Sequence, residues 1–274
     1  VALFLNRGTP HPQAIIPLLD KNAVPLIAPS TGAMVLHQPV QKHVFNVRAT
    51  YQREAEKAIA HLATIGINKI ALVYVDDSFG ADGLAGAQKG MAAAKLTPVV
   101  LEKFDRSKPD FSKIAPAIQK ANAQTVMMIA SGAAVVDGIK AIRAAGSNAQ
   151  IVTLSNNASG GFITSLGDNA TGVIVTQVFP QSIGFSFVKE ASDLARAKDI
   201  REVSPSMLEG FAAAKVLVEA LRRAGAKPSR ERIQTALEGM GKFDLGGLEI
   251  GYSSKDHTGL DFADLSIISS NGKF

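Results

Sequence analysis

Two spacings of hydrophobic residues alternate along this chain. Short, nearly continuous apolar runs are typical of buried parallel strands, and apolar residues three or four positions apart are typical of helices packed on one side. The apolar runs predict strands at residues 1–5, 24–28, 69–75, 98–104, 125–130, 150–154 and 172–178. The helical spacing predicts helices at residues 12–22, 51–65, 81–94, 111–121 and 133–145. This alternation predicts an α/β fold with parallel sheets and right-handed crossovers.

The pattern changes after residue 178. Helices are predicted at residues 183–198, 206–224 and 229–237, and one last strand at residues 262–269. Because these helices do not alternate with strands, they must pack on a sheet formed by residues that precede them in the chain. We therefore expect two doubly wound, Rossmann-like lobes joined by a hinge, with a ligand cleft between them. The first lobe would comprise residues 1–50 and 179–260, and the second residues 51–178 and 261–274.

Polar residues next to the predicted elements have ordinary structural roles. Thr50 and Asp110 are suited to cap the helices that follow them, and Gly146 is suited to end a helix. The adjacent acids Asp76 and Asp77 follow a strand, where cap and loop roles are commoner than metal binding or catalysis.

The loop after the second strand has the features of a ligand site. The sequence VPLIAPSTG ends an apolar run at Pro29 and then presents Ser30, Thr31 and Gly32. Hydroxyls and backbone N–H groups at the end of a parallel strand can hold a small polar ligand. The same residues are also typical of an ordinary turn or helix cap, so this motif indicates a ligand site only together with other motifs of the chain.

Composition and charge narrow the function classes. The formal net charge of +5 comes from basic residues spread along the chain without interleaved aromatics, so nucleic acid is not an expected partner. There is no cysteine, and no apolar run approaches the roughly 18 residues of a membrane helix. The five histidines lack metal-binding spacing, and the sequence has no nucleophile elbow, phosphate-binding loop or dinucleotide motif. The sequence therefore predicts no catalytic residue, metal or cofactor.

Several longer motifs carry a family resemblance. They are GTPHPQA at residues 8–14, VPLIAPSTGA at 24–33, VFNVRATYQREAE at 44–56, KIALVYVDDSFGADG at 69–83, DFSKIAPAIQKA at 110–121, IKAIRAAG at 139–146 and LEGFAAAKVLVEALRRAG at 208–225. In this order and spacing, the chain resembles the type I periplasmic binding proteins of ABC importers, in the leucine/isoleucine/valine-binding branch. The resemblance covers essentially the whole chain. Residues 1–5 read as a strand without a preceding cap, initiator Met or signal peptide, so we expect an N-terminal part, including two βα units, to be missing here.

The resemblance implies a set of ligand-binding residues. In the first lobe it implies Thr9 and the loop Ser30, Thr31 and Gly32, as donors to a ligand carboxylate. In the second lobe it implies aromatic residues that close over the ligand, and polar loop residues after two strands. These residues are Tyr51, Phe79, Ser131, Gly132, Ser155 and Asn156.

One departure from the family pattern leaves the ligand class open. Amino-acid binders in the family hold the ligand ammonium with carboxylates of the second lobe, but the matching positions here are Tyr51 and Ser155. A buried ammonium without a counter-charge costs several kcal/mol. Either Glu209 supplies the charge from the first lobe, or the ligand is an aromatic or aliphatic acid without an amine. Arg48 could hold a carboxylate or pair with a surface acid.

The resemblance also implies a function and its partners. The chain would capture a small carboxylate, close its hinge by a population shift, and deliver the ligand to a membrane permease driven by an ATPase. We expect a monomer in the periplasm, or tethered outside the cell. The alternative is the ligand-sensing domain of a receptor or regulator, because the same fold also serves sensing.

Overall fold

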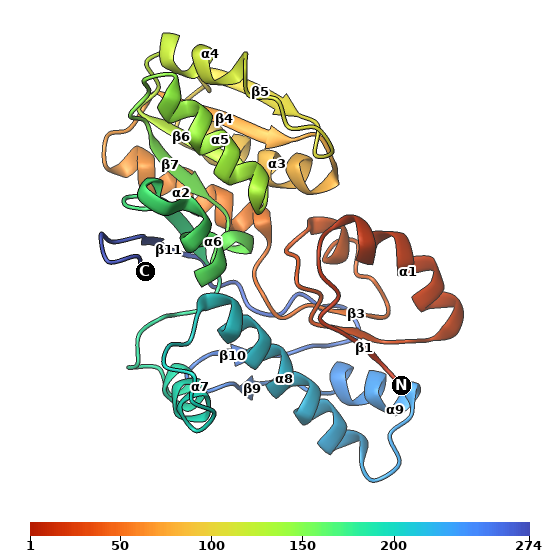
Figure 1. Ribbon diagram of the computed structural model, residues 1–274. Coiled ribbons are helices and arrows are strands. Elements are labelled where there is room, and N and C mark those ends of the chain that lie inside the picture. Colours follow the sequence, from red (N-terminus) through yellow and green to blue (C-terminus); the bar gives the residue numbers. More distant parts are fainter. The chain divides into compact units, whose positions relative to one another are not determined.

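The computed structural model describes residues 1–274 and divides into two compact units (Figure 1). The first unit comprises Val1–Thr50 and Val178–Phe262, and the second comprises Tyr51–Gln177 and Ala263–Phe274. No helix combines the length and the apolar character needed to cross a membrane.

The first unit contains β1 (Leu3–Phe4), α1 (Pro10–Asn22), β2 (Leu26–Ile27), β3 (Val44–Phe45), α7 (Ser186–Arg196), α8 (Pro205–Ala224), α9 (Arg230–Glu238), β9 (Phe243–Asp244) and β10 (Glu249–Ile250). The second contains α2 (Tyr51–Thr64), β4 (Ile70–Val75), α3 (Ser78–Ala93), β5 (Val100–Phe104), α4 (Ile114–Lys120), β6 (Thr125–Ile129), α5 (Ala133–Ala144), β7 (Gln150–Thr153), α6 (Gly160–Leu166), β8 (Ile174–Gln177) and β11 (Asp264–Ile267).

The second unit is built on one six-stranded sheet with the order β11-β8-β7-β6-β4-β5. Five strands are parallel, and β11 runs antiparallel to β8 at one edge. The apolar runs between residues 69 and 178 all form strands of this sheet, so the predicted α/β class with a parallel sheet is confirmed. Because the strands are parallel, the loops that follow them meet at one edge of the sheet.

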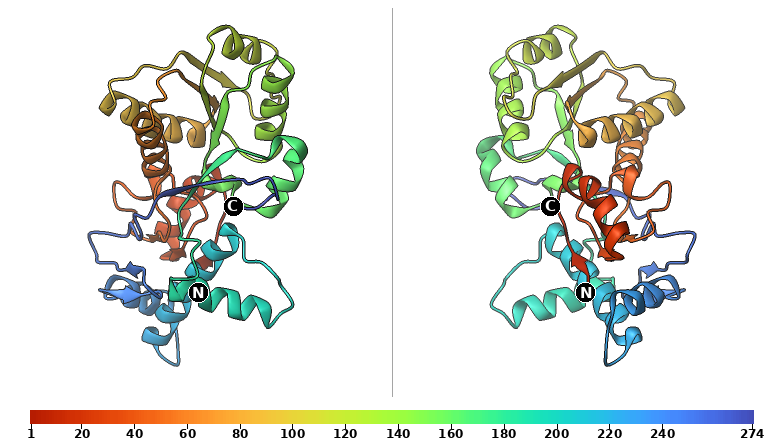
Figure 2. Two further views of the ribbon diagram at one scale, coloured as in Figure 1. Left: turned by 90° about the vertical axis from the view of Figure 1, so that its left-hand side faces the viewer. Right: turned by 90° about the vertical axis from the view of Figure 1, so that its right-hand side faces the viewer.

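Helices cover both faces of this sheet (Figures 1 and 2). Gly83 of α3 faces Ile129, whereas Gly138 of α5 faces Met128, so the two helices pack on opposite sides of β6. Helix α3 also packs closely on α2. A Cβ atom at Gly86 would lie 2.4 Å from the Cα atom of Gln52, so only glycine permits this approach. The Gly-rich sequence of α3 therefore serves helix–helix contact as well as contact with the sheet.

The first unit has a smaller parallel sheet with the order β1-β2-β3. Leu26 packs with Leu19 of α1 in one cluster, while Ile27 belongs to a larger cluster with residues of α7, α8 and α9. Adjacent residues of β2 thus face opposite sides, as in any strand. Strands β9 and β10 form a short antiparallel hairpin. Helices α7, α8 and α9 pack in this unit without strands of their own, as the sequence pattern predicts.

Several element boundaries differ from the sequence predictions. Helix α3 begins at Ser78 because the Asp77 side chain accepts hydrogen bonds from two backbone N–H groups of its first turn. Asp110 does not cap a helix: its carboxylate accepts the Ser112 N–H, and α4 begins only at Ile114. Strand β3 and helix α6 were not predicted, because one has two residues and the other seven.

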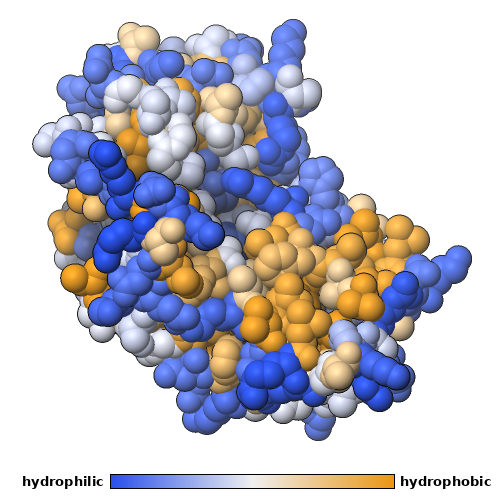
Figure 3. Space-filling model, turned by 60° about the horizontal axis from the view of Figure 1, so that its bottom comes forward, coloured by the Kyte–Doolittle hydropathy of each residue, from blue (hydrophilic) through white to orange (hydrophobic).

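Apolar side chains gather on part of the surface shown in Figure 3. Most of the exposed large apolar residues belong to the first unit, among them Leu3 and Phe4 of β1 and Val218 of α8. Strand β1 is an edge strand of its sheet, and an exposed apolar edge favours association with another strand.

Candidate functional site

Two hydroxyls lie together where β1 and β2 of the first unit end. The Thr9 and Thr31 Oγ1 atoms are 2.8 Å apart, and both residues are almost completely buried. Thr9 precedes α1 but does not cap it with its side chain, because the hydroxyl is bonded to Thr31 instead. The Thr31 Oγ1 atom also accepts the Ala33 N–H at 3.4 Å. Of the two hydroxyl protons, one lies in the mutual bond and the other is available to a ligand.

The backbone of the same loop offers fewer donors than the resemblance implied. The Ser30 N–H donates to the Asn6 carbonyl, and the Thr31 N–H donates to the Pro29 carbonyl. The Gly32 N–H and the Ser30 hydroxyl have no hydrogen-bond partner within the chain. Among the predicted residues of this unit, the available donors are therefore the Gly32 N–H, the Ser30 hydroxyl and one threonine hydroxyl.

Glu209 is paired with a buried cation of its own unit. The Arg48 Nη1 atom lies 3.5 Å from the Glu209 Oε2 atom, and the arginine side chain is only 2% exposed. The Glu209 Oε1 atom is buried without a hydrogen-bond partner. Since Arg48 compensates its charge, Glu209 is poorly suited to be the counter-charge of a ligand ammonium.

Burial perturbs a histidine near the same arginine. Both ring nitrogens of His37 are buried without hydrogen-bond partners. Burial, and to a lesser extent the positive charge of Arg48, lowers the pKa of His37 from 6.5 to about 4, against an opposing effect of Asp256. His37 is therefore neutral at pH 7 and cannot serve as a cation for a carboxylate there.

Two predicted aromatic residues lie against each other in the second unit. Tyr51 begins α2 and Phe79 lies in the first turn of α3, and their ring centroids are 4.8 Å apart in an edge-to-face arrangement. Both side chains are buried. The Asp77 cap accepts the Phe79 N–H and so fixes the turn that carries this ring.

Ser131 takes part in a polar cluster at the carboxyl edge of the second sheet. Arg106, in the loop after β5, donates through Nε to an Asp77 carboxylate oxygen at 2.6 Å and through Nη1 to the Ser131 hydroxyl at 3.1 Å. Arg106 was not predicted as a site residue. Its signal in the sequence is weak: it is a single arginine five residues before Phe111, and only the fold brings it beside Asp77.

Asn157 connects the loops after β6 and β7. Its side-chain oxygen accepts the Gly132 N–H at 3.0 Å, and its Nδ2 donates to the Ala130 carbonyl and the Thr153 hydroxyl. The predicted residue Asn156 donates to the same Ala130 carbonyl at 3.2 Å. Sequence analysis singled out Asn156 but missed its neighbour, which is the more buried of the two and fixes the shape of both loops.

A buried carboxylate supports Ser155. The Glu54 Oε2 atom accepts the Ser155 N–H at 3.0 Å and also the hydroxyl of Thr176. Glu54 lies on α2 and is fully buried. It was overlooked because its position among the polar residues YQREAE gives no sign of burial. The second unit thus contains an acid beside Ser155, already bonded to the chain's own donors.

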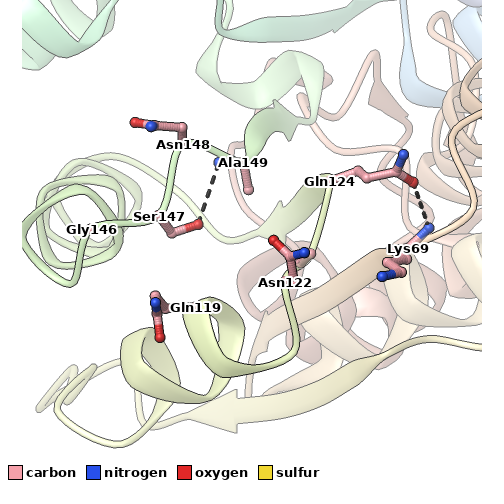
Figure 4. Close-up of a pocket in the computed structure, with 9 residues that line it drawn as sticks. Lys69, Gln119, Asn122, Gln124, Gly146, Ser147, Asn148 and Ala149 are labelled. Atoms are coloured by element: carbon pink, nitrogen blue, oxygen red, sulfur yellow. Dashed lines mark hydrogen bonds between the residues drawn. The ribbon is translucent and has the colours of Figure 1, made fainter.

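A separate polar hollow lies at the opposite edge of the second sheet (Figure 4). Its volume is about 440 Å³, and its lining includes Lys69, Asn122 and Gln124. Gln124 precedes β6, and its side chain accepts the Lys69 N–H at 2.9 Å. In parallel α/β sheets ligands bind at the carboxyl ends of the strands, so this hollow at their amino ends is not the candidate site. No cluster of acidic or histidine residues suited to a metal ion occurs in the structure.

Comparisons with known proteins agree with this architecture. A family model described as periplasmic binding protein matches residues 2–267. A structure from Rhodopirellula baltica SH 1, described as a possible leucine/isoleucine/valine-binding protein, has 27% identity and a TM-score of 0.90, over 98% of this chain and 75% of that one. A substrate-binding periplasmic protein from Ralstonia solanacearum has 28% identity and a TM-score of 0.85, over 97% of this chain and 77% of that one.

A more distant structure shows the same fold. The branched-chain amino acid ABC transporter protein from Thermus thermophilus, with bound valine, has 20% identity and a TM-score of 0.83, over 99% of this chain and 76% of that one. A search of curated proteins found no match. The matched family and these structures are binding proteins, not enzymes. Since the family model spans nearly the whole chain, the chain belongs to the periplasmic binding protein family, type I.

Proposed function

We propose that this protein is the substrate-binding component of an ABC importer and that its ligand is a small carboxylate. The first unit would hold the carboxylate with Thr31, Ser30 and Gly32, and the second would cover the ligand with Tyr51 and Phe79. Closure of the two units on the ligand, and delivery to a permease in the membrane, belong to the same proposal. Family membership implies a periplasmic or extracellular location.

One observation favours a carboxylate as the ligand. The loop after β2 has a free backbone N–H at Gly32, a free hydroxyl at Ser30 and a buried hydroxyl pair at Thr9 and Thr31. Several neutral donors within one short loop suit an anionic oxygen pair, because hydrogen bonds to charged acceptors are about twice as strong as neutral ones. Among the predicted residues of the second unit, the backbone N–H groups of Gly132 and Ser155 are already bonded within the chain.

The pairing of the acidic residues near the candidate site favours a ligand that is an acid without an amine over an amino acid. The two acids near the predicted residues, Glu209 and Glu54, are already engaged by Arg48 and by the Ser155 and Thr176 donors. Glu54 cannot offer Oε2 to a ligand ammonium without losing these two bonds, and the charge of Glu209 is already compensated by Arg48.

A thermal-shift and calorimetry screen tests this function. The panel contains branched-chain amino acids and aliphatic and aromatic acids without an amine, with Thr31→Val as the test variant and the exposed Thr235→Val of the same unit as its control. A ligand raises the melting temperature by mass action. We expect an amine-free acid to bind and Thr31→Val to weaken it about tenfold, the worth of one hydrogen bond to a charged group. No shift with any carboxylate would refute the proposal.

A further inference from the structure

Gln177 ends β8 with an amide that has no partner. The residue is 2% exposed, and both its Nε2 and Oε1 atoms are buried without a hydrogen bond. A buried polar group that makes no hydrogen bond costs about 1–3 kcal/mol, and native proteins keep few of them. An amide in this state needs an explanation, and a ligand that completes its hydrogen bonds is one.

The position of Gln177 on the sheet points to the ligand edge. Strands β7 and β8 pair Thr153 with Val175, so the same register two residues further brings Gln177 level with Ser155. Both residues therefore lie at the carboxyl ends of their strands, where α/β proteins bind ligands. The preceding residue, Thr176, faces Glu54 of α2, so the Gln177 side chain extends toward the other face of the sheet.

The surroundings of Gln177 favour a neutral ligand group. Glu54 lies on the opposite face and is already bonded to Ser155 and Thr176. Asp264 is the residue paired with Gln177 across β11, but it is solvent-exposed and accepts the N–H of Leu265. An amide donates through one atom and accepts through the other, which matches a hydroxyl group and does not neutralise an ammonium.

We propose that the Gln177 amide binds a hydroxyl group of the ligand, and that this protein therefore prefers hydroxylated carboxylates to their unsubstituted or amino counterparts. This inference rests on the proposed function. It adds a specificity-determining residue in the second unit and narrows the ligand class from small acids to hydroxy acids.

Matched acids test the proposal by isothermal titration calorimetry. The probes are 2-hydroxy-4-methylpentanoate with 4-methylpentanoate and leucine, and 4-hydroxybenzoate with benzoate. We expect the wild-type protein to bind the hydroxylated member of at least one pair about tenfold more tightly. We expect Gln177→Leu to remove that preference and to raise the melting temperature of the ligand-free protein, since it deletes an unsatisfied buried amide. The exposed Gln119→Leu should change neither quantity.

A second variant separates ligand contact from a role in folding. Gln177→Glu keeps the shape of the side chain but adds a charge, so it should raise the affinity for leucine relative to the hydroxy acid by about tenfold. If Gln177→Leu keeps the hydroxyl preference, or if its ligand-free melting temperature is lower than that of the wild-type protein, the inference about Gln177 is wrong. The proposed function would still stand. If the wild-type protein binds none of the probes, the proposed function fails and the inference fails with it.

Discussion

The candidate ligand residues of the two units differ in how much of their hydrogen bonding the chain itself uses. In the first unit, the Gly32 N–H and the Ser30 hydroxyl have no partner in the chain. In the second, the N–H groups of Gly132 and Ser155 donate within the unit, and the Ser131 hydroxyl accepts a hydrogen bond from Arg106. The first unit thus leaves a backbone N–H group without a partner, whereas the second uses the N–H groups of its candidate residues to fix its own loops.

This difference indicates a division of roles. Loops held by buried side chains keep their shape without a ligand, so the loops of the second unit and the packed Tyr51 and Phe79 rings are preformed. Under the proposed function, the first unit would supply directional hydrogen bonds to the ligand. Removal of a loop support should therefore cost stability in the second unit, while removal of a donor in the first should cost mainly affinity.

The largest expected effect is that of Glu54→Ala. The substitution leaves the Ser155 N–H and the Thr176 hydroxyl buried without an acceptor, so the free energy of unfolding of the second unit should fall by about 3–5 kcal/mol. Urea denaturation followed by circular dichroism measures this change.

Glu56→Ala is the matched control on the same helix. The Glu56 side chain pairs with the exposed Lys89 at 2.9 Å, a contact worth at most about 1 kcal/mol. If the two variants lose equal stability, Glu54 does not support the loop and the contrast between the units disappears.

Acid should weaken the first unit through His37. Because burial lowers the pKa of this histidine to about 4, the unfolded state binds its proton first as the pH falls below 6.5. Stability should therefore decline between pH 6.5 and pH 4, by up to about 3 kcal/mol. Burial also lowers the pKa of His257 in the same unit, which acts in the same direction.

The pH dependence of the unfolding midpoint tests this expectation. His37→Gln should remove most of the decline between pH 6.5 and pH 4, whatever its effect at pH 7, while the exposed His61→Gln of the second unit should leave it in place. An equally steep decline in His37→Gln would assign the acid sensitivity to other groups.

A smaller effect is expected at the cap of α3. Asp77→Ala removes the acceptor of the Phe79 and Gly80 N–H groups, which should cost about 1 kcal/mol of stability. It also releases Arg106, whose guanidinium bonds Asp77 and Ser131. Chemical denaturation measures the loss, with Asp76→Ala as control, because the exposed Asp76 pairs only with exposed Lys103. A loss as small as that of the control would contradict the capping role.

The sequence predicted the fold better than the site, for a physical reason. Strands β4, β6, β7 and β8 of the large sheet are buried apolar runs, which the sequence shows directly, and the more exposed β5 and β11 follow at predicted positions. The two-residue strand β3 and the seven-residue helix α6 are too short to show a period.

The residues of the candidate site that were not predicted act through contacts with residues distant in the chain. Glu54 bonds Ser155 and Thr176, about one hundred residues further on, and nothing in its neighbours marks it as buried. Asn157 and Arg106 likewise gain their roles only when parallel strands bring successive loops together. Thr31 was anticipated from its strand-end loop and Thr9 from the family resemblance, but the use of the Ser30 and Thr31 N–H groups by the chain was not anticipated.

A crystal structure of the protein with its best-binding carboxylate is the most direct test of these roles. We expect the two carboxylate oxygens to lie within about 3 Å of the Gly32 backbone nitrogen and the hydroxyls of Ser30 or Thr31. We also expect the loops of the second unit to keep the Glu54 and Asn157 hydrogen bonds. A carboxylate bound instead in the polar hollow beside Lys69 and Gln124, or held by donors of the second unit alone, would contradict the account.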